Sequence, residues 1–237
     1  MRLVNEQGIV LRSYPFGEAD RVVVLLSPQR GKIRAVAKGI RKGKSRFGGR
    51  LEPFTHVDVV LYEGRELYTV TQAAVIESFP HIRDDLDRVI AAATMVEVVD
   101  AVSQERESSV RLFLLLRKGL AALEAGVIGS ELVASYLLKL AEAVGLAPAL
   151  VACAACGRRD GLERFSFAEG GVLCPDCSSV GDVKMRAGLI AYLAVLAASD
   201  FGHLPTSDLA GEAMGVTRRF VEHHLDRRLQ SLAALDG

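Results

Sequence analysis

The four cysteines of this chain form a single pattern, and this pattern constrains the fold more than any other feature. Cys153-x2-Cys156 is followed, after seventeen residues, by Cys174-x2-Cys177, and no cysteine is left over. Two such pairs separated by roughly 15–20 residues are typical of a tetrahedral zinc site, to which each pair contributes two thiolates. The spacing therefore predicts one structural Zn²⁺ ion per chain, bound by all four cysteines.

The residues between the two pairs predict a zinc ribbon. Gly157 can adopt the positive φ that turns backbone N–H groups toward the sulfurs. Residues 165–168 and 172–173 flank Glu169-Gly170-Gly171, which indicates a hairpin. Four thiolates leave no coordination position open for substrate, and the sequence lacks the His-x-Glu proton shuttle of zinc deaminases. We favour a structural ion over two alternatives, which are a redox or vestigial site and a catalytic metal.

Charge is distributed unevenly along the chain, although the net charge is zero. Positions 30–50 carry nine basic residues and no acidic one, which leaves 20 basic against 29 acidic residues elsewhere. The chain is thus an acidic body with one basic segment, and such a segment favours a polyanionic partner. The nine are Arg30, Lys32, Arg34, Lys38, Arg41, Lys42, Lys44, Arg46 and Arg50.

The first 80 residues predict a small antiparallel barrel. Five stretches are rich in branched residues or alternate apolar and polar residues with a period of two. Five short strands in about 75 residues favour an OB-fold, with an SH3-like barrel as the structural alternative. The stretches are residues 8–11, 21–26, 32–38, 54–62 and 67–75.

After Pro80 the hydrophobic period becomes helical. We expect helices near residues 86–96, 108–125, 130–144, 184–199 and 206–234. The predicted fold is therefore α+β and multidomain, with a five-stranded OB-fold barrel and a helical domain that carries a four-cysteine zinc-ribbon insertion. The predicted boundaries are 1–80 for the barrel, 81–148 and 181–237 for the two parts of the helical domain, and 149–180 for the zinc module.

The third predicted strand and the loop after it form the candidate nucleic-acid site. Alternation places Ile33, Ala35 and Ala37 on one face, and the strand cations on the other. A loop rich in glycine and cations follows, and Phe47 within it could stack on a base. The alternative is a charged loop that is merely solvated. The predicted contact residues are Lys32, Arg34, Lys38, Arg41, Lys42, Lys44, Arg46, Phe47 and Arg50.

The same loop contains Gly43-Lys44-Ser45, which invites comparison with a phosphate-binding P-loop. That motif requires Gly-x4-Gly-Lys-[Ser/Thr] and a following helix. Here Lys38 stands where the first glycine should be, and Gly48, Gly49 and Pro53 oppose a helix. We expect no nucleotide cofactor. No Ser/His/Asp, Cys/His or paired-carboxylate arrangement can be read from the sequence, so we expect no enzymatic activity.

The chain shows no sign of membrane targeting. Charged residues throughout the first twenty positions lead us to expect no signal peptide. The longest apolar run, residues 187–199, is too short to span a bilayer. Paired cysteines in such a chain favour metal over disulfides, and we expect a cytoplasmic protein of bacterial type.

Together these features resemble the RecO family of bacterial recombination mediators. The similarity lies in Gly8-Ile9-Val10-Leu11, in Gly17-Glu18-Ala19-Asp20, in Gly31-Lys32 followed by Ala37-Lys38-Gly39-Ile40-Arg41, and in the two cysteine pairs. The resemblance implies binding of single- and double-stranded DNA, annealing of complementary strands, and no covalent catalysis. It also implies RecR and single-strand DNA-binding protein as partners, help in loading RecA, and association with the nucleoid during repair.

Three other classes of function remain open. OB-folds with zinc ribbons also occur in RNA-binding accessory factors, which is the main alternative. A metalloenzyme or ATPase conflicts with the closed thiolate set and the broken P-loop. A scaffold whose acidic body binds proteins would show no salt-sensitive affinity for DNA.

Overall fold

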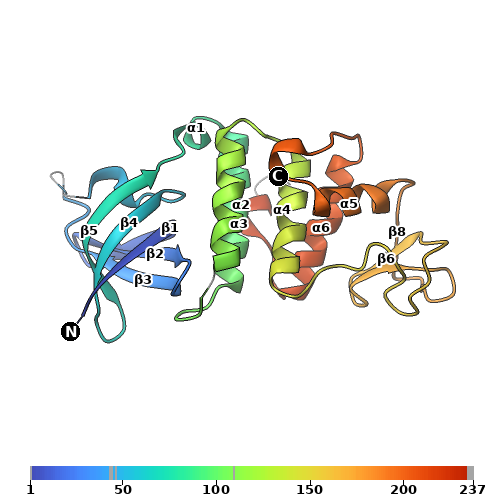
Figure 1. Cartoon of the computed structure of the whole chain (residues 1–237), viewed down its shortest axis with the longest axis horizontal. Coiled ribbons are helices and arrows are strands. Elements are labelled where there is room, and N and C mark those ends of the chain that lie inside the picture. The colour runs from blue at the N-terminus through green and yellow to red at the C-terminus, as the bar shows by residue number, and fades with distance from the viewer. Residues whose placement is uncertain (1, 43–44, 46, 109, 234–237) are drawn as a thin grey trace. The chain divides into compact units, whose positions relative to one another are not determined.

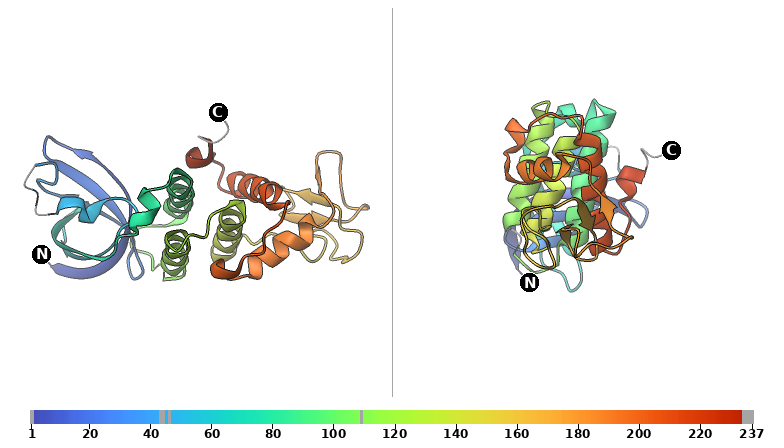
Figure 2. Two further views of the ribbon diagram at one scale, coloured as in Figure 1. Left: turned by 90° about the horizontal axis from the view of Figure 1, so that it is seen from above. Right: turned by 90° about the vertical axis from the view of Figure 1, so that its right-hand side faces the viewer.

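The computed structural model describes residues 2–42, 45, 47–108 and 110–233 (Figures 1 and 2). Contacts divide the chain into two compact units, Met1–Glu124 and Ala125–Gly237. The finer division inferred from the sequence, at residues 80, 148 and 180, stays a prediction.

The first unit begins with a closed barrel of five strands, joined in the order β1-β2-β3-β5-β4 (Figure 1). Neighbouring strands are antiparallel except β3 and β5, which pair in parallel. The predicted five-stranded OB-fold is confirmed. The strands are β1 (Leu3–Phe16), β2 (Asp20–Ser27), β3 (Gly31–Ala37), β4 (His56–Tyr62) and β5 (Tyr68–Glu77).

Strand β1 is much longer than the sequence predicts, because it serves two neighbours in succession. Leu3 to Ile9 pair with β4, while Ile9 to Phe16 pair with β2. A bulge at Leu11 shifts the register between these parts, where Val10 faces Leu25 and Arg12 faces Val24. The predicted stretch 8–11 is only the part of this strand that is buried throughout.

Strand β2 is buried on both faces. Val23 and Leu25 point into the barrel core, as do Ile33, Ala35 and Ala37 of β3, which confirms the predicted inward face. On the opposite face of β2, Val22, Val24 and Leu26 are also buried, because helices α2 and α3 pack against β1 and β2. This two-sided burial explains why β2 reads as a continuous apolar run rather than as an alternation.

Three helices complete the first unit, and two of them lie side by side (Figure 1). Asp85 caps α2 by accepting a 3.0 Å hydrogen bond from the Arg88 N–H. Pro80 opens the short α1, in a position where the missing N–H is not needed. The helices are α1 (Pro80–Arg83), α2 (Leu86–Val102) and α3 (Val110–Glu124).

The connection from α2 to α3 docks on the turn between β2 and β3. The Lys32 N–H donates to the Gln104 carbonyl at 2.9 Å, and the Arg106 N–H donates to the Arg30 carbonyl at 3.0 Å. Gly31 has a φ of +64°, and a Cβ there would collide with the carbonyl oxygens of Gln104 and Glu107. Only glycine therefore fits this turn beneath the docked segment.

The second unit contains a small helix group and a three-stranded sheet (Figure 2). Helix α4 packs against α5 and α6, around Tyr136, which is fully buried and stacks on Phe201 at 6.2 Å. The elements are α4 (Ser130–Ala143), β6 (Arg164–Ser166), β7 (Gly171–Leu173), β8 (Val183–Lys184), α5 (Leu189–Ala198), the 3₁₀ turn η2 (Phe201–His203), α6 (Ala210–His224) and α7 (Gln230–Ala233).

Two helix predictions in this unit need correction. The helix expected over 184–199 begins only at Leu189, because Val183 and Lys184 pair with β6. The helix expected over 206–234 is interrupted after His224, where Asp226 adopts a φ of +47°. The Glu222 carboxylate accepts a 2.8 Å hydrogen bond from the Leu229 N–H, and this tertiary contact stabilises a break that no glycine or proline marks.

None of the helices in the described part of the chain combines the length and the apolar content that crossing a bilayer requires.

A buried histidine lies where the barrel meets α3. His56 is 1% exposed, and its ring packs edge-on against Phe113 with the ring centres 5.4 Å apart. Its Nε2 is 3.1 Å from Gln7 Oε1, and its Nδ1 is 3.3 Å from Glu77 Oε2. Burial lowers the pKa of His56 below its ordinary value of 6.5, although Glu77 acts in the raising direction and Arg117 adds to the lowering.

This histidine should make the first unit less stable in acid. Below about pH 6.5 the unfolded chain binds a proton at position 56 that the folded chain does not bind, so acid favours unfolding. We expect the urea midpoint, followed through amide hydrogen exchange of β4, to fall between about pH 7 and about pH 5.5, and to fall less in His56→Gln. His203→Gln, an exposed change, serves as the control. An equal fall in all three proteins would contradict the assignment.

Candidate metal centre and nucleic-acid interface

The structure brings the four cysteines together in the second unit. Their sulfur atoms all lie within 4.8 Å of one another, and Cys156 Sγ and Cys174 Sγ are 3.7 Å apart. Four sulfurs at a Zn–S distance of about 2.3 Å in a tetrahedron would be about 3.8 Å apart. Cys153 and Cys174 are buried, while Cys156 is exposed. The predicted ligand set therefore fits a metal ion.

Each cysteine pair occupies a tight turn of backbone. In the first turn the Gly157 N–H donates to the Cys153 carbonyl at 2.9 Å, and Gly157 has the predicted positive φ, +77°. In the second turn the Ser178 N–H donates to the Cys174 carbonyl at 3.0 Å. These local bonds hold the two sulfurs of each pair close together.

The small sheet brings the two turns to the same place. The predicted hairpin is present as β6 and β7, with Gly170 at a φ of +74° in its turn. The Ala154 N–H donates to the Val172 carbonyl at 2.8 Å, which ties the first turn to β7. An ion pair of 2.7 Å joins Arg158 to Asp176, one from each turn.

The electrostatics of the cluster favour a bound cation. The backbone N–H of Cys174, followed by those of Cys156 and Ala155, lowers the pKa of Cys153 to about 6. Hydrogen bonds with the thiols of Cys156 and Cys174 raise the pKa of Cys177 to about 12. The Cys153 thiolate thus forms readily, whereas the neighbouring thiols disfavour ionisation of Cys177. A divalent cation among the sulfurs would stabilise all four thiolates.

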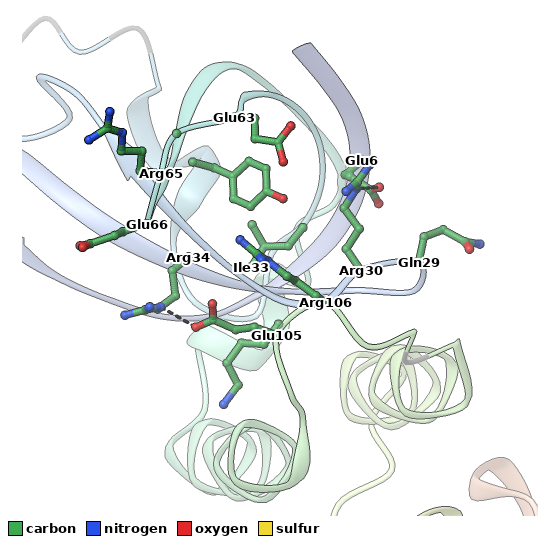
Figure 3. Close-up of a pocket in the computed structure, with 13 residues that line it drawn as sticks. Glu6, Gln29, Arg30, Ile33, Arg34, Glu63, Arg65, Glu66, Glu105 and Arg106 are labelled. Atoms are coloured by element: carbon green, nitrogen blue, oxygen red, sulfur yellow. Dashed lines mark hydrogen bonds and ion pairs between the residues drawn. The ribbon is translucent and has the colours of Figure 1, made fainter. Parts of the chain in front are cut away.

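At the β2–β3 end of the barrel, the basic segment is already neutralised by acids of the same chain. Lys32 Nζ lies 2.9 Å from Asp100 Oδ1, with the Lys32 side chain only 17% exposed. Arg34 Nε lies 2.6 Å from Glu105 Oε1 (Figure 3). Burial acts to raise the pKa of Asp100, but Lys32 and Arg12 together lower it. The structure therefore does not support the predicted role of Lys32 and Arg34 in binding phosphates.

The other end of β3 carries exposed cations. Lys38, Arg41 and Lys42 are exposed and, among the residues that the structure describes, form no ion pair with an acid. Arg50, also exposed, lies in the 3₁₀ turn η1 (Gly48–Leu51). We call these four residues the basic loop. Two further predicted contact residues, Lys44 and Arg46, lie outside the described residues.

The basic loop is tethered to the turn between β1 and β2. The Arg41 N–H donates to the Ala19 carbonyl at 3.0 Å, and the Gly39 N–H donates to Asp20 Oδ1 at 2.7 Å. These bonds hold the start of the loop against the barrel, so the exposed cations of Lys38 and Arg41 project from a fixed edge.

The prediction that Phe47 stacks on a base is wrong. Its side chain is 1% exposed and packs with Leu51 in the barrel core. Phe47 is the N-cap residue of the 3₁₀ turn η1, and Leu51 is its last residue. Removing a large aromatic ring from water is favourable, so Phe47 packs in the core and is not available to a base.

A hollow of about 450 Å³ lies near the β2–β3 turn, and its lining carries both signs of charge (Figure 3). Arg65 and Arg106 face it together with Glu63 and Glu66. Arg30 also lines it, but its Nε lies 2.8 Å from the buried Glu6. This balance does not favour a polyanion, so the hollow is a weaker candidate for nucleic acid than the basic loop.

The P-loop comparison also fails in three dimensions. Gly48 to Leu51 form the four-residue 3₁₀ turn η1, whereas a phosphate-binding loop requires an α-helix with its N-terminus toward the phosphates.

Comparison with known proteins places the whole chain in one family. The family model described as "Recombination protein O N terminal" matches residues 1–79, and "Recombination protein O C terminal" matches residues 83–233. The DNA repair protein RecO of Nocardioides sp. is 42% identical over 242 residues, 99% of each chain. Those of Frankia casuarinae and Thermobifida fusca are 40% and 37% identical, over 100% of this chain and 99% of theirs. Since both models match and the identity extends over the full length, the chain belongs to the RecO family.

Proposed function

We propose that this protein acts in DNA repair and recombination as a DNA-binding mediator rather than as an enzyme. It binds single- and double-stranded DNA, promotes annealing of complementary strands and, together with RecR, helps to load RecA. The main support is the basic loop on the edge of an OB-fold in a chain that is otherwise acidic. The relatives named DNA repair protein RecO support the process.

Annealing requires two polyanions to come close together. The exposed cations of Lys38, Arg41 and Lys42, with Arg50 beside them, can neutralise phosphates, and displaced counterions then drive association. Phosphate contacts carry no sequence information. Base pairing between the two strands supplies the specificity, so the protein needs no base-specific contact for this step.

The partners and the location follow from family membership. We infer that the protein works in the bacterial cytoplasm, associates with the nucleoid during repair, and meets RecR and single-strand DNA-binding protein there.

Reversing the charge of the basic loop should weaken DNA binding irrespective of sequence. In Lys38→Glu/Arg41→Glu/Lys42→Glu we expect a loss of more than tenfold at about 0.1 M salt, and a log–log salt slope that is smaller by about one for each lost phosphate contact. Fluorescence anisotropy with single-stranded and duplex DNA over a salt series measures both quantities.

A control variant with the same change in net charge is Arg65→Glu/Arg106→Glu/Lys118→Glu, whose three cations are exposed elsewhere on the first unit. It should keep most of the affinity. Unchanged DNA affinity in the basic-loop variant would contradict the proposed binding site. Tighter binding of a matched single-stranded RNA by the unaltered protein would favour an RNA-binding accessory factor instead.

We further propose that the ion bound by Cys153, Cys156, Cys174 and Cys177 is one structural Zn²⁺ per chain. The support is the closed set of four thiolates, the ligands that structural zinc prefers. The three strands of this module are two to three residues long, and a small cluster around Cys153, Leu173 and Cys174 is the core assigned to it. The ion supplies the cross-link, with apparent binding energies of roughly 10–16 kcal/mol in zinc peptides.

Replacing one cysteine ligand should unfold the zinc module without affecting the first unit. Cys174→Ser is expected to lose most of the one zinc per chain, measured by mass spectrometry of the metal, and to become protease-sensitive between the cysteine pairs. Because the proposed DNA site lies on the barrel, DNA affinity should stay within about twofold. A Cys174→Ser protein that keeps its zinc, or one that remains folded and DNA-bound but no longer anneals strands, would contradict a purely structural ion.

A further inference from the structure

The outer face of β1 carries two aromatic side chains, Tyr14 and Phe16. After the bulge at Leu11, Ser13 pairs with the core residue Val23. Because residues two apart on a strand face the same way, Arg12, Tyr14 and Phe16 point to the opposite, outer face. Phe16 is 48% exposed, which is unusual for so large an apolar side chain, and Tyr14 is half-buried.

The strand register extends this face across β2 and β3. Tyr14 is opposite Val22, and Val22 is opposite Val36; both valines are buried, at 1% and 7% exposed. In the neighbouring row of the same face, Arg12 is opposite Val24, and Val24 is opposite Arg34. Tyr14 therefore begins a row whose other two side chains are buried valines, whereas Phe16 lies beyond this row, at the end of β1.

On the other side, the face meets the basic loop. Phe16 is opposite Asp20, and Asp20 accepts the hydrogen bond from Gly39 that tethers the loop. Lys38 immediately precedes that tether. The exposed ring of Phe16 and the cation of Lys38 therefore lie at the same end of the barrel sheet, separated by the start of β2.

Arg12 holds the inner edge of the face in place. Its guanidinium lies 5.6 Å from the centre of the Tyr14 ring, and its Nε lies 2.7 Å from Asp100 Oδ2. This geometry fixes the orientation of Tyr14 through a cation–π contact, so that less conformational freedom is lost when a ligand packs on the ring.

We propose that Tyr14 and Phe16 form a stacking platform for the bases of single-stranded DNA, whose phosphates the basic loop binds. An aromatic ring stacks on any unpaired base regardless of sequence, whereas the bases of a duplex are already stacked on one another. An apolar protein partner would cover the rings but leave the neighbouring cations unpaired. The inference rests on the proposed DNA binding and deepens it, because it assigns the preference for single strands to particular side chains.

The first test removes the rings and leaves the cations. Tyr14→Ala/Phe16→Ala is expected to weaken oligo(dT) binding about tenfold or more, with no change in the salt slope, because no phosphate contact is lost. Duplex affinity should stay within about twofold. The matched control is Leu3→Ala, which removes another exposed apolar side chain, 61% exposed, from the same strand and should change neither affinity. Tyr14→Phe, which keeps the ring, should retain the affinity for oligo(dT).

The second test does not depend on a truncated side chain. The chain contains no tryptophan, so Phe16→Trp introduces a single fluorescent reporter on the platform. We expect its emission to be quenched by oligo(dT), and to remain unchanged with heparin, which is a polyanion without bases, or with blunt duplex.

The results separate this inference from the broader proposal. Two results would contradict the stacking platform while leaving DNA binding intact. In the first, the alanine substitutions weaken the affinity for single-stranded and duplex DNA equally. In the second, the fluorescence of the tryptophan does not change when oligo(dT) binds. If the unaltered protein binds neither form in a salt-dependent way, the proposed function fails and the platform fails with it.

Discussion

Burial of β2 on both faces is the constraint on which the rest of the first unit depends. Val23 and Leu25 fill the barrel, while Val22, Val24 and Leu26 require cover from outside. Helices α2 and α3 provide that cover, and their connection must then pass across the β2–β3 turn. Gly31 permits this close approach, since any side chain there would strike the carbonyls of the docked segment. The helices thus cover the outer face of the barrel, whose inner core is formed by the strands together with Phe47 and Leu51.

The same packing divides a single basic segment into two parts with different roles. Asp100, near the end of α2, pairs with Lys32, and Glu105 of the docked α2–α3 connection pairs with Arg34. The half-exposed Arg34–Glu105 pair adds little stability, but both pairs neutralise the positive potential locally. Lys38, Arg41 and Lys42, at the opposite end of β3, form no ion pair with an acid among the residues that the structure describes. Under the proposed function, a polyanion would meet these cations and not the hollow of mixed charge.

The segment that carries the four cysteines has only a small hydrophobic core of its own. Strands of two or three residues cannot hold a segment of about thirty residues by themselves. Tight turns present the sulfurs in pairs, and the Arg158–Asp176 ion pair and the bond from Ala154 to β7 bring the pairs together. Four sulfurs placed in this way could hold a metal ion, and a closed set of four thiolates would leave no open position for chemistry.

The sequence by itself determined whatever depends on local geometry. The two-residue period of β3 predicts that Ile33, Ala35 and Ala37 face inward, and the cysteine spacing predicts the ligand set, because both are consequences of backbone geometry over a few residues. Only the tertiary structure decided which charges remain available. Lys32 meets Asp100 across 68 positions of sequence, Phe47 packs into the barrel core, and Tyr14 and Phe16 acquire their neighbours only through the pairing of β1 with β2. Ion pairs and exposed rings depend on where distant segments return, and no local period encodes that return.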